Sequence, residues 1–178
     1  MKMCRCDEAG LEEAAAVLMS GGVAVIPTDT VYGLAAHPDF PDAVERLYTI
    51  KGREAKKPIA LLAADAESTP VVGVLANLWP GALTIVCEGE GYRVPDHEWT
   101  RRLIRRCGGL LRVTSANLSG RRPAADAPAA LAEVGLAADI TIDGGTSPGG
   151  VPSTVVKLAP DGAIEVLREG AVKIGSPI

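Results

Sequence analysis

Two threonines stand in a turn that directly follows an apolar run. Val23 to Ile26 is apolar, Pro27 ends the run, and Thr28 and Thr30 come next in the segment PTDTVYGL. Open α/β sheets bind ligands at the carboxyl ends of their strands, and threonine hydroxyls hydrogen-bond small polar molecules. Threonines also serve as ordinary turn and cap residues. The spacing alone therefore leaves both roles open.

A second group of reactive side chains is basic. Lys51, Arg53, Lys56 and Lys57 lie within seven residues of sequence. Arginine offers a planar fork to two phosphate oxygens and lysine a compact point charge, so such a cluster suits a polyphosphate. It lacks the GxxxxGK[ST] pattern of a Walker-type loop. A solvated charged loop is the alternative.

Residues 114–120, with the sequence TSANLSG, form a third polar segment after an apolar strand. Hydroxyls, an amide and free backbone N–H groups in one turn are suited to ribose or phosphate contacts. A simple capping turn would have the same composition. Elsewhere, Arg93 precedes a rigid Val-Pro turn and would suit a carboxylate, while Ser153 opens a strand after a glycine-rich loop.

Other residue types give weaker signals. Four arginines at i,i+4 spacing in residues 101–106 predict a solvated helix face, with RNA contact as the alternative. The two histidines are far apart in sequence, and no Ser/His/Asp or Cys/His arrangement indicates covalent catalysis. The four cysteines lack zinc spacing, so we predict no metal ligands.

Composition limits the class of protein. The chain has 178 residues, which fits one domain, 1–178. A net charge of -4 and 3% aromatic residues argue against a module that binds nucleic acid by bulk charge or stacking. No apolar run approaches the ~20 residues of a membrane span, and the acidic N-terminal segment is unlike a signal peptide. We therefore expect a cytoplasmic protein without a membrane partner.

The hydrophobic pattern predicts an α/β or mixed α+β fold, because helices and strands alternate early and strands dominate later. Pro41 predicts the start of a second helix, and residues 64–78 are expected to be helical in part. The other predicted helices are 7–19 and 98–107, and the predicted strands are 23–26, 59–63, 83–87, 110–114, 139–142, 154–158 and 164–167.

Seven segments, taken in order, resemble the YrdC/Sua5 family over residues 21–170. They are PTDTVYGL at 27–34, KGR and KKP within 51–58, LWPGALT at 78–84, RVPDH at 93–97, TSANLSG at 114–120, STVV at 153–156 and LREG at 167–170. The chain is similar to the short, single-domain members. It departs from many relatives in residues 87–92, where a longer loop is usual.

The resemblance implies a twisted, mixed, open sheet flanked by helices, with a concave basic cavity. It implies that the chain is a nucleotidyltransferase, converting L-threonine, bicarbonate and ATP to threonylcarbamoyl-AMP and pyrophosphate. Partner proteins would transfer the group to adenosine at position 37 of tRNA. Mg²⁺ is expected on the triphosphate, held by phosphate and water.

The resemblance also implies roles for individual residues. Lys51 and Arg53 are expected in catalysis, and Thr30, Arg93 and Ser153 are expected to bind threonine. The residues expected to bind ATP are Arg53, Lys57, Ser115, Asn117 and Arg168. Two alternatives stay open: a paralogue with another carbamoyl or nucleotide substrate, and an RNA-binding module. A weak contact with tRNA or double-stranded RNA is part of the second.

Overall fold

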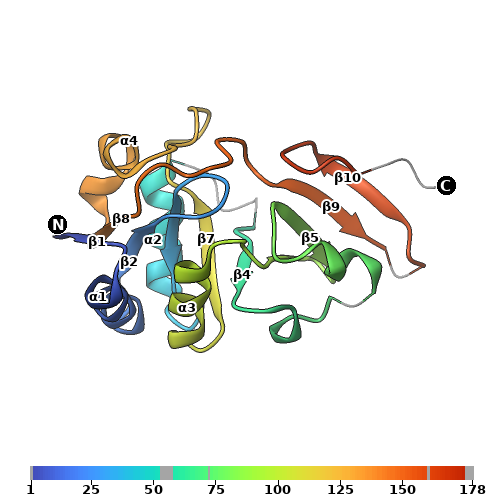
Figure 1. The fold of residues 1–178 in the computed structure, drawn as a ribbon, viewed down its shortest axis with the longest axis horizontal. Coiled ribbons are helices and arrows are strands. Elements are labelled where there is room, and N and C mark those ends of the chain that lie inside the picture. The colour runs from blue at the N-terminus through green and yellow to red at the C-terminus, as the bar shows by residue number, and fades with distance from the viewer. Residues whose placement is uncertain (1, 53–57, 72, 160, 175–178) are drawn as a thin grey trace.

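One mixed sheet of ten strands runs through the molecule, in the order β1-β8-β2-β3-β7-β4-β6-β5-β9-β10 (Figure 1). The computed structural model describes residues 2–52, 58–71, 73–159 and 161–174. The helices are α1 (Glu8–Met19), α2 (Pro41–Lys51), α3 (Glu98–Arg106) and α4 (Ala127–Glu133). The strands are β1 (Lys2–Arg5), β2 (Val23–Ile26), β3 (Gly33–Ala36), β4 (Leu61–Ala63), β5 (Leu83–Cys87), β6 (Glu90–Arg93), β7 (Leu110–Ser115), β8 (Ile140–Asp143), β9 (Thr154–Leu158) and β10 (Ile164–Arg168).

Helices cover both faces of the first half of the sheet. Alternate residues of a strand point to opposite faces, and β2 is apolar throughout. Ala24 and Ile26 pack in a core with α1 and α3. Val23 and Val25 pack in a second core with α2 and α4. This double covering explains why β2 is a continuous apolar run and why the strand leads to a buried turn.

A third core lies under the other half of the sheet, around Trp79, Leu83, Ile85 and Val156. Strand β4 joins the halves, because it pairs antiparallel with β7 and parallel with β6. Figure 1 shows β5, β9 and β10 on one side of β4 and the helix-covered strands on the other. The polar segments of the sequence meet at this junction.

The shortened segment between residues 87 and 92 is a tight hairpin. β5 and β6 pair antiparallel, and only Glu88 and Gly89 connect them. Both have positive φ angles, 53° and 88°, as a type I′ turn requires. Strand β6 ends at Arg93, and Arg93 lines the cavity.

The structure confirms most predicted elements and differs at several places. Asp7 caps α1 by accepting a hydrogen bond from Gly10 N at 2.9 Å, and α2 begins at Pro41. Residues 64–78 form no α-helix among the described residues, only the short 3₁₀ turns Ala66–Ser68 and Val74–Leu78. Strands β1, β3 and β6 and helix α4 are additional. No helix in the described ranges is long and apolar enough to cross a membrane.

Candidate functional site

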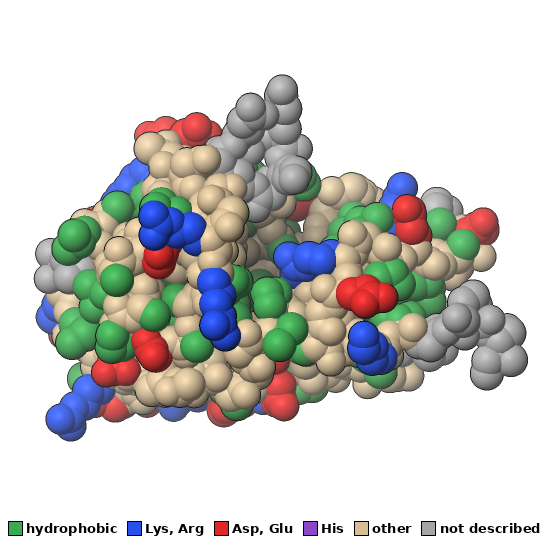
Figure 2. All heavy atoms as spheres, turned by 90° about the horizontal axis from the view of Figure 1, so that it is seen from above, with side chains coloured by type: hydrophobic (Ala, Val, Ile, Leu, Met, Phe, Trp, Pro, Cys, Tyr) green, Lys and Arg blue, Asp and Glu red, His purple; other side chains and the backbone are tan. Residues whose placement is uncertain are grey.

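A cavity of about 470 Å³ opens at the junction of the two halves. Figure 2 shows the surface hollowed there, with Lys or Arg side chains on both sides. Its described lining includes Arg93, Arg121 and Arg168 and contains no acidic side chain. The structure therefore confirms the expected concave basic cavity. The polar residues that line it are Thr28, Thr30, Thr84, Thr114, Ser115, Asn117 and Ser153.

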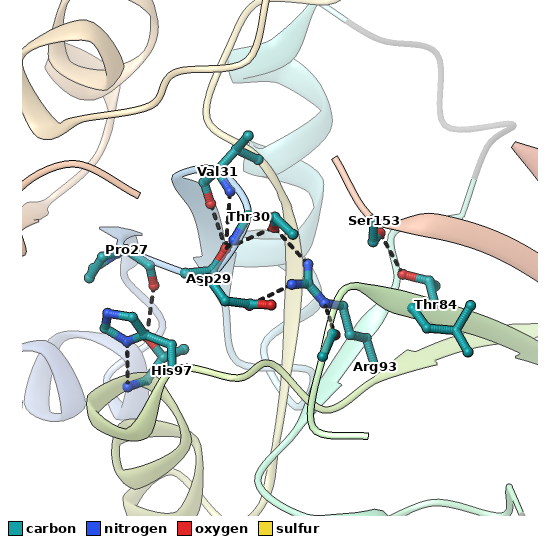
Figure 3. Close-up of polar contacts among 12 residues, drawn as sticks. Pro27, Asp29, Thr30, Val31, Thr84, Arg93, His97 and Ser153 are labelled. Carbon is teal, nitrogen blue, oxygen red and sulfur yellow. Dashed lines mark hydrogen bonds and ion pairs between the residues drawn. The ribbon is translucent and has the colours of Figure 1, made fainter. Parts of the chain in front are cut away.

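Arg93 is held by three hydrogen bonds (Figure 3). Its Nε donates to Gly81 O at 3.0 Å, Nη1 to Thr30 Oγ1 at 2.9 Å, and Nη2 to Asp29 Oδ1 at 2.5 Å. A guanidinium has five N–H donors, so these bonds leave two for a ligand. Arg93 is 6% exposed but lines the cavity, so a bound carboxylate would meet a donor whose position is already set.

The pKa of Arg93 depends on its burial and on two charged neighbours, Asp29 and Arg168. Burial lowers the pKa of Arg93, the Asp29 carboxylate opposes this change, and the positive charge of Arg168 lowers the pKa further. Two arginines and one carboxylate thus lie close together beside the cavity.

Thr30 is fixed within its own turn. Thr28 donates its hydroxyl hydrogen to Val31 O at 2.7 Å, and the hydroxyl oxygens of Thr28 and Thr30 lie 3.0 Å apart. Since the single hydrogen of Thr28 is already used, Thr30 must donate to Thr28. Thr30 also accepts from Arg93. Its described contacts therefore orient Arg93.

Ser153 belongs to a second polar group in the cavity. Its Oγ lies 2.9 Å from Thr84 Oγ1, a residue to which sequence reasoning gave no role although it ends the LWPGALT segment. Arg168 Nη2 donates to Ser153 O at 2.7 Å and approaches Ser153 Oγ at 3.3 Å. Arg168, expected on the nucleotide side, thus lies beside a residue expected to bind threonine.

Lys51 holds the polar turn that follows β7. Its Nζ donates to Ser115 O at 2.6 Å and to Asn117 O at 2.7 Å, and the residue is 4% exposed. The Asn117 amide donates to Leu118 O and to Arg121 O. Lys51 therefore fixes the backbone from which Ser115 and Asn117 face the cavity, and its catalytic role stays a prediction.

Other predicted residues lie outside the described part or away from the cavity. Arg53 and Lys57 belong to residues 53–57, outside the described ranges, while Pro58, the next residue, lines the cavity. On α3, Arg102 pairs with Glu8 at 2.5 Å and Arg106 with Glu12 at 3.1 Å. Neither lines the cavity.

His97 supports the cavity from behind the Thr28 turn. Thr100 donates its hydroxyl hydrogen to Pro27 O at 2.7 Å, and its Oγ1 lies 2.9 Å from His97 Nδ1. Burial lowers the pKa of His97, against the opposing charges of Asp29 and Asp96. Across the described ranges, no three His, Cys, Asp or Glu side chains are grouped so as to hold a metal ion.

Comparison with known proteins gives consistent matches. Residues 16–170 match the Sua5/YciO/YrdC family model, described as "telomere recombination". A Bacillus subtilis protein named threonylcarbamoyl-AMP synthase is 33% identical over 91% of this chain. The match covers 54% of that protein, so the chain spans about half of its length. A Bos taurus protein of the same name is also 33% identical, over 90% of this chain and 67% of its own length.

Solved structures support the same grouping. P. abyssi Sua5, solved in complex with L-threonine, is 30% identical with a TM-score of 0.83, over 95% of this chain and 56% of that one. E. coli YciO has a TM-score of 0.81 over 95% of this chain and 94% of its own, but at 24% identity it supports the fold alone.

Proposed function

Because this chain belongs to the Sua5/YciO/YrdC family, we propose that it is a nucleotidyltransferase that forms threonylcarbamoyl-AMP from L-threonine, bicarbonate and ATP. The observation that supports the proposal is the cavity, which is lined both by a pre-oriented Arg93 and by Ser115 and Asn117 of the turn after β7. A carboxylate and a nucleotide would both find donors there, and no described acidic side chain lines the wall to repel them.

The chemistry agrees with this set of residues. The threonine amine combines with bicarbonate to give a carbamate and water. A carbamate oxygen then attacks the α-phosphorus of ATP, and the bond to the departing pyrophosphate oxygen breaks. Since the carbamate is already anionic, the second step needs no strong general base. The protein has to align two anions and stabilise the phosphate charge, which Arg, Lys and hydroxyl groups can do.

The proposed roles follow the cavity from one end to the other. Arg93 would hold the threonine carboxylate, with Thr30 fixing Arg93 and Ser153 facing the amino acid. Ser115 and Asn117 would contact the nucleotide. Arg168, next to Ser153, would lie between the two substrates. By family resemblance, the phosphate contacts come from Arg53 and Lys57, and catalysis uses Lys51 and Arg53.

Mg²⁺ would enter with the triphosphate. No acidic side chain lines the described cavity, so its residues fit an ion that keeps phosphate and water ligands, as Mg²⁺ usually does. The ion would neutralise part of the phosphate charge. We further propose that the product passes to partner proteins that modify adenosine 37 of tRNA, which places the protein in the cytoplasm.

Pyrophosphate release tests the proposal. Purified protein with Mg²⁺ and ATP should release pyrophosphate only when both L-threonine and bicarbonate are present. Arg93→Ala should lower this release at least tenfold, because a hydrogen bond to a charged group contributes about 1.5–3 kcal/mol. Arg122→Ala is the matched control, because Arg122 is exposed and absent from the cavity lining.

Release that is independent of threonine would contradict the proposal. If carbamoyl phosphate replaced threonine and bicarbonate in supporting ATP cleavage, the paralogue with another carbamoyl substrate would be the correct alternative.

A further inference from the structure

A carboxylate of α4 anchors the polar turn that follows β7. Glu133, the last residue of α4, accepts a hydrogen bond from Leu118 N at 3.3 Å through Oε2. Its other oxygen, Oε1, accepts from Arg121 Nη1 at 3.1 Å. Arg121 lines the cavity and Glu133 does not, so the carboxylate contacts Arg121 from outside the cavity wall. Neither residue belongs to the seven segments that carry the family resemblance.

Helix stability does not account for a glutamate at this position. The C-terminal end of a helix carries a partial negative charge, so a carboxylate there is unfavourable and lysine or arginine is preferred. The last turn of α4 contains no basic residue. The Glu133 side chain is nevertheless only 21% exposed, against 65% for that of Arg121. The described interactions that offset this cost are the contacts with Leu118 and Arg121, which lie outside the helix.

Arg121 is the charged donor that this turn offers to an anion. Both amide hydrogens of Asn117 are used inside the turn, at Leu118 O (2.9 Å) and Arg121 O (2.8 Å). Asn117 therefore has no N–H to give to a phosphate oxygen. Arg121 uses one of its five guanidinium hydrogens on Glu133, and among the described residues no other acceptor takes the rest.

We propose that Arg121 is a further nucleotide-binding residue and that Glu133 is the positioning residue that holds its guanidinium at the cavity wall. A guanidinium fork suits two phosphate oxygens. Because Glu133 restricts the side chain before the nucleotide arrives, less conformational entropy is lost on binding. This inference rests on the proposed function, because it takes the nucleotide to lie beside Ser115 and Asn117.

The kinetics of pyrophosphate release test Arg121. Arg121→Gln removes the charge, so the KM for ATP should rise about tenfold, as expected for the loss of one hydrogen bond to a charged group. The KM for L-threonine should stay unchanged. Arg121→Lys keeps the charge without the planar fork and should recover part of the loss. The matched control is Arg122→Gln, at an exposed neighbour that is absent from the cavity lining, and it should change neither KM.

The direction of the change in KM for ATP tests Glu133. A carboxylate that positions Arg121 gives a higher KM for ATP in Glu133→Ala, whereas a carboxylate that competes with phosphate gives a lower one. The double variant should add little to Arg121→Gln, because Glu133 acts through Arg121. The control is Glu45→Gln, at an exposed glutamate of α2. A lower KM for ATP, or equal rises for ATP and threonine as a purely structural role would produce, would overturn the positioning role.

Binding of α,β-methylene-ATP, which cannot be cleaved at the reacting bond, separates this inference from the proposed function. Calorimetry with Mg²⁺ should show the wild type binding the analogue about tenfold more tightly than Arg121→Gln. Equal binding by the two proteins, with threonine-dependent pyrophosphate release intact, would overturn the inference and leave the function standing. Binding that depends on Arg121 without any pyrophosphate release would support the inference and overturn the proposed function.

Discussion

Arg93 and Thr30 are separated by 63 positions in sequence and share a hydrogen bond of 2.9 Å. Both residues were expected near the amino acid from the motifs that contain them. The sequence does not predict that Thr30 orients Arg93, because this role depends on which acceptor each hydroxyl hydrogen meets. The hydrogen of Thr28 is used by Val31 O, so the Thr30 hydroxyl donates to Thr28 and accepts from Arg93. Such a hydrogen count needs three-dimensional partners, so sequence spacing could not predict it.

His97 predicts a pH dependence of stability. Burial lowers its pKa below the ordinary value of 6.5, so between the two values the unfolded chain binds more protons than the folded one. The free energy of unfolding should therefore fall as the pH is lowered through about 6.5. Urea unfolding at pH 7.5 and 5.5 measures the fall. His97→Asn keeps a side chain suited to cap α3 and should show a smaller fall. An equal fall in both proteins would remove His97 as the cause.

At the scale of elements, the helices predicted from the sequence are those with a capping residue or proline at the start and apolar residues at helical spacing. Asp7 and Pro41 indicate helix starts, and both act so in the structure, whereas the end of α2 at Gly52 is not predicted. Strand β3 escapes prediction because its first two residues, Gly33 and Leu34, belong to the PTDTVYGL motif, whose polar residues indicate a turn. Helix α4 has seven residues, too few for a periodic signal. Edge strand β1 is mostly exposed and defined by its pairing with β8.

Lys51 connects two elements, the end of α2 and the turn after β7. Lys51→Met would leave the carbonyls of Ser115 and Asn117 without these hydrogen bonds. An unpaired buried polar group costs about 1–3 kcal/mol, so the free energy of unfolding should fall by roughly 2 kcal/mol. Chemical denaturation measures it, with Lys157→Met as a control at an exposed lysine. Lost activity with unchanged stability would instead show that Lys51 acts only in catalysis.

For the whole molecule, the distribution of charge matters more than its sum. The net charge is -4, yet the charged side chains in the described cavity lining are all arginines. The arginines of α3 lie elsewhere, and two of them form ion pairs with Glu8 and Glu12 of α1. The net charge argues against a bulk nucleic-acid binder, but composition cannot show that one set of arginines lies on α3 beside α1 and another lines the cavity.

This contrast gives a prediction about variants. Arg102→Ala and Arg106→Ala should leave pyrophosphate release and tRNA retention unchanged, because exposed ion pairs are screened by water. Arg53→Ala and Lys57→Ala should instead weaken ATP use, because family resemblance assigns both residues to ATP. Filter binding of tRNA and initial rates at several ATP concentrations provide the measurements. A loss of tRNA binding in the α3 variants would instead identify that face as an RNA contact.

The β5–β9 pairing has a consequence for protein synthesis. Thr84 is made well before Ser153, and Arg168 leaves the ribosome later still, yet all three form one wall of the cavity. In the described sheet, strand β5 pairs with β6 on one side and with β9 on the other. A nascent chain that has not reached residue 153 therefore exposes an unpaired β5 edge and has no complete place for an amino acid. An amino-acid ligand can therefore stabilise the fold only after translation has passed residue 153. Substrate added to ribosome-bound chains that end before this residue should not protect them from protease.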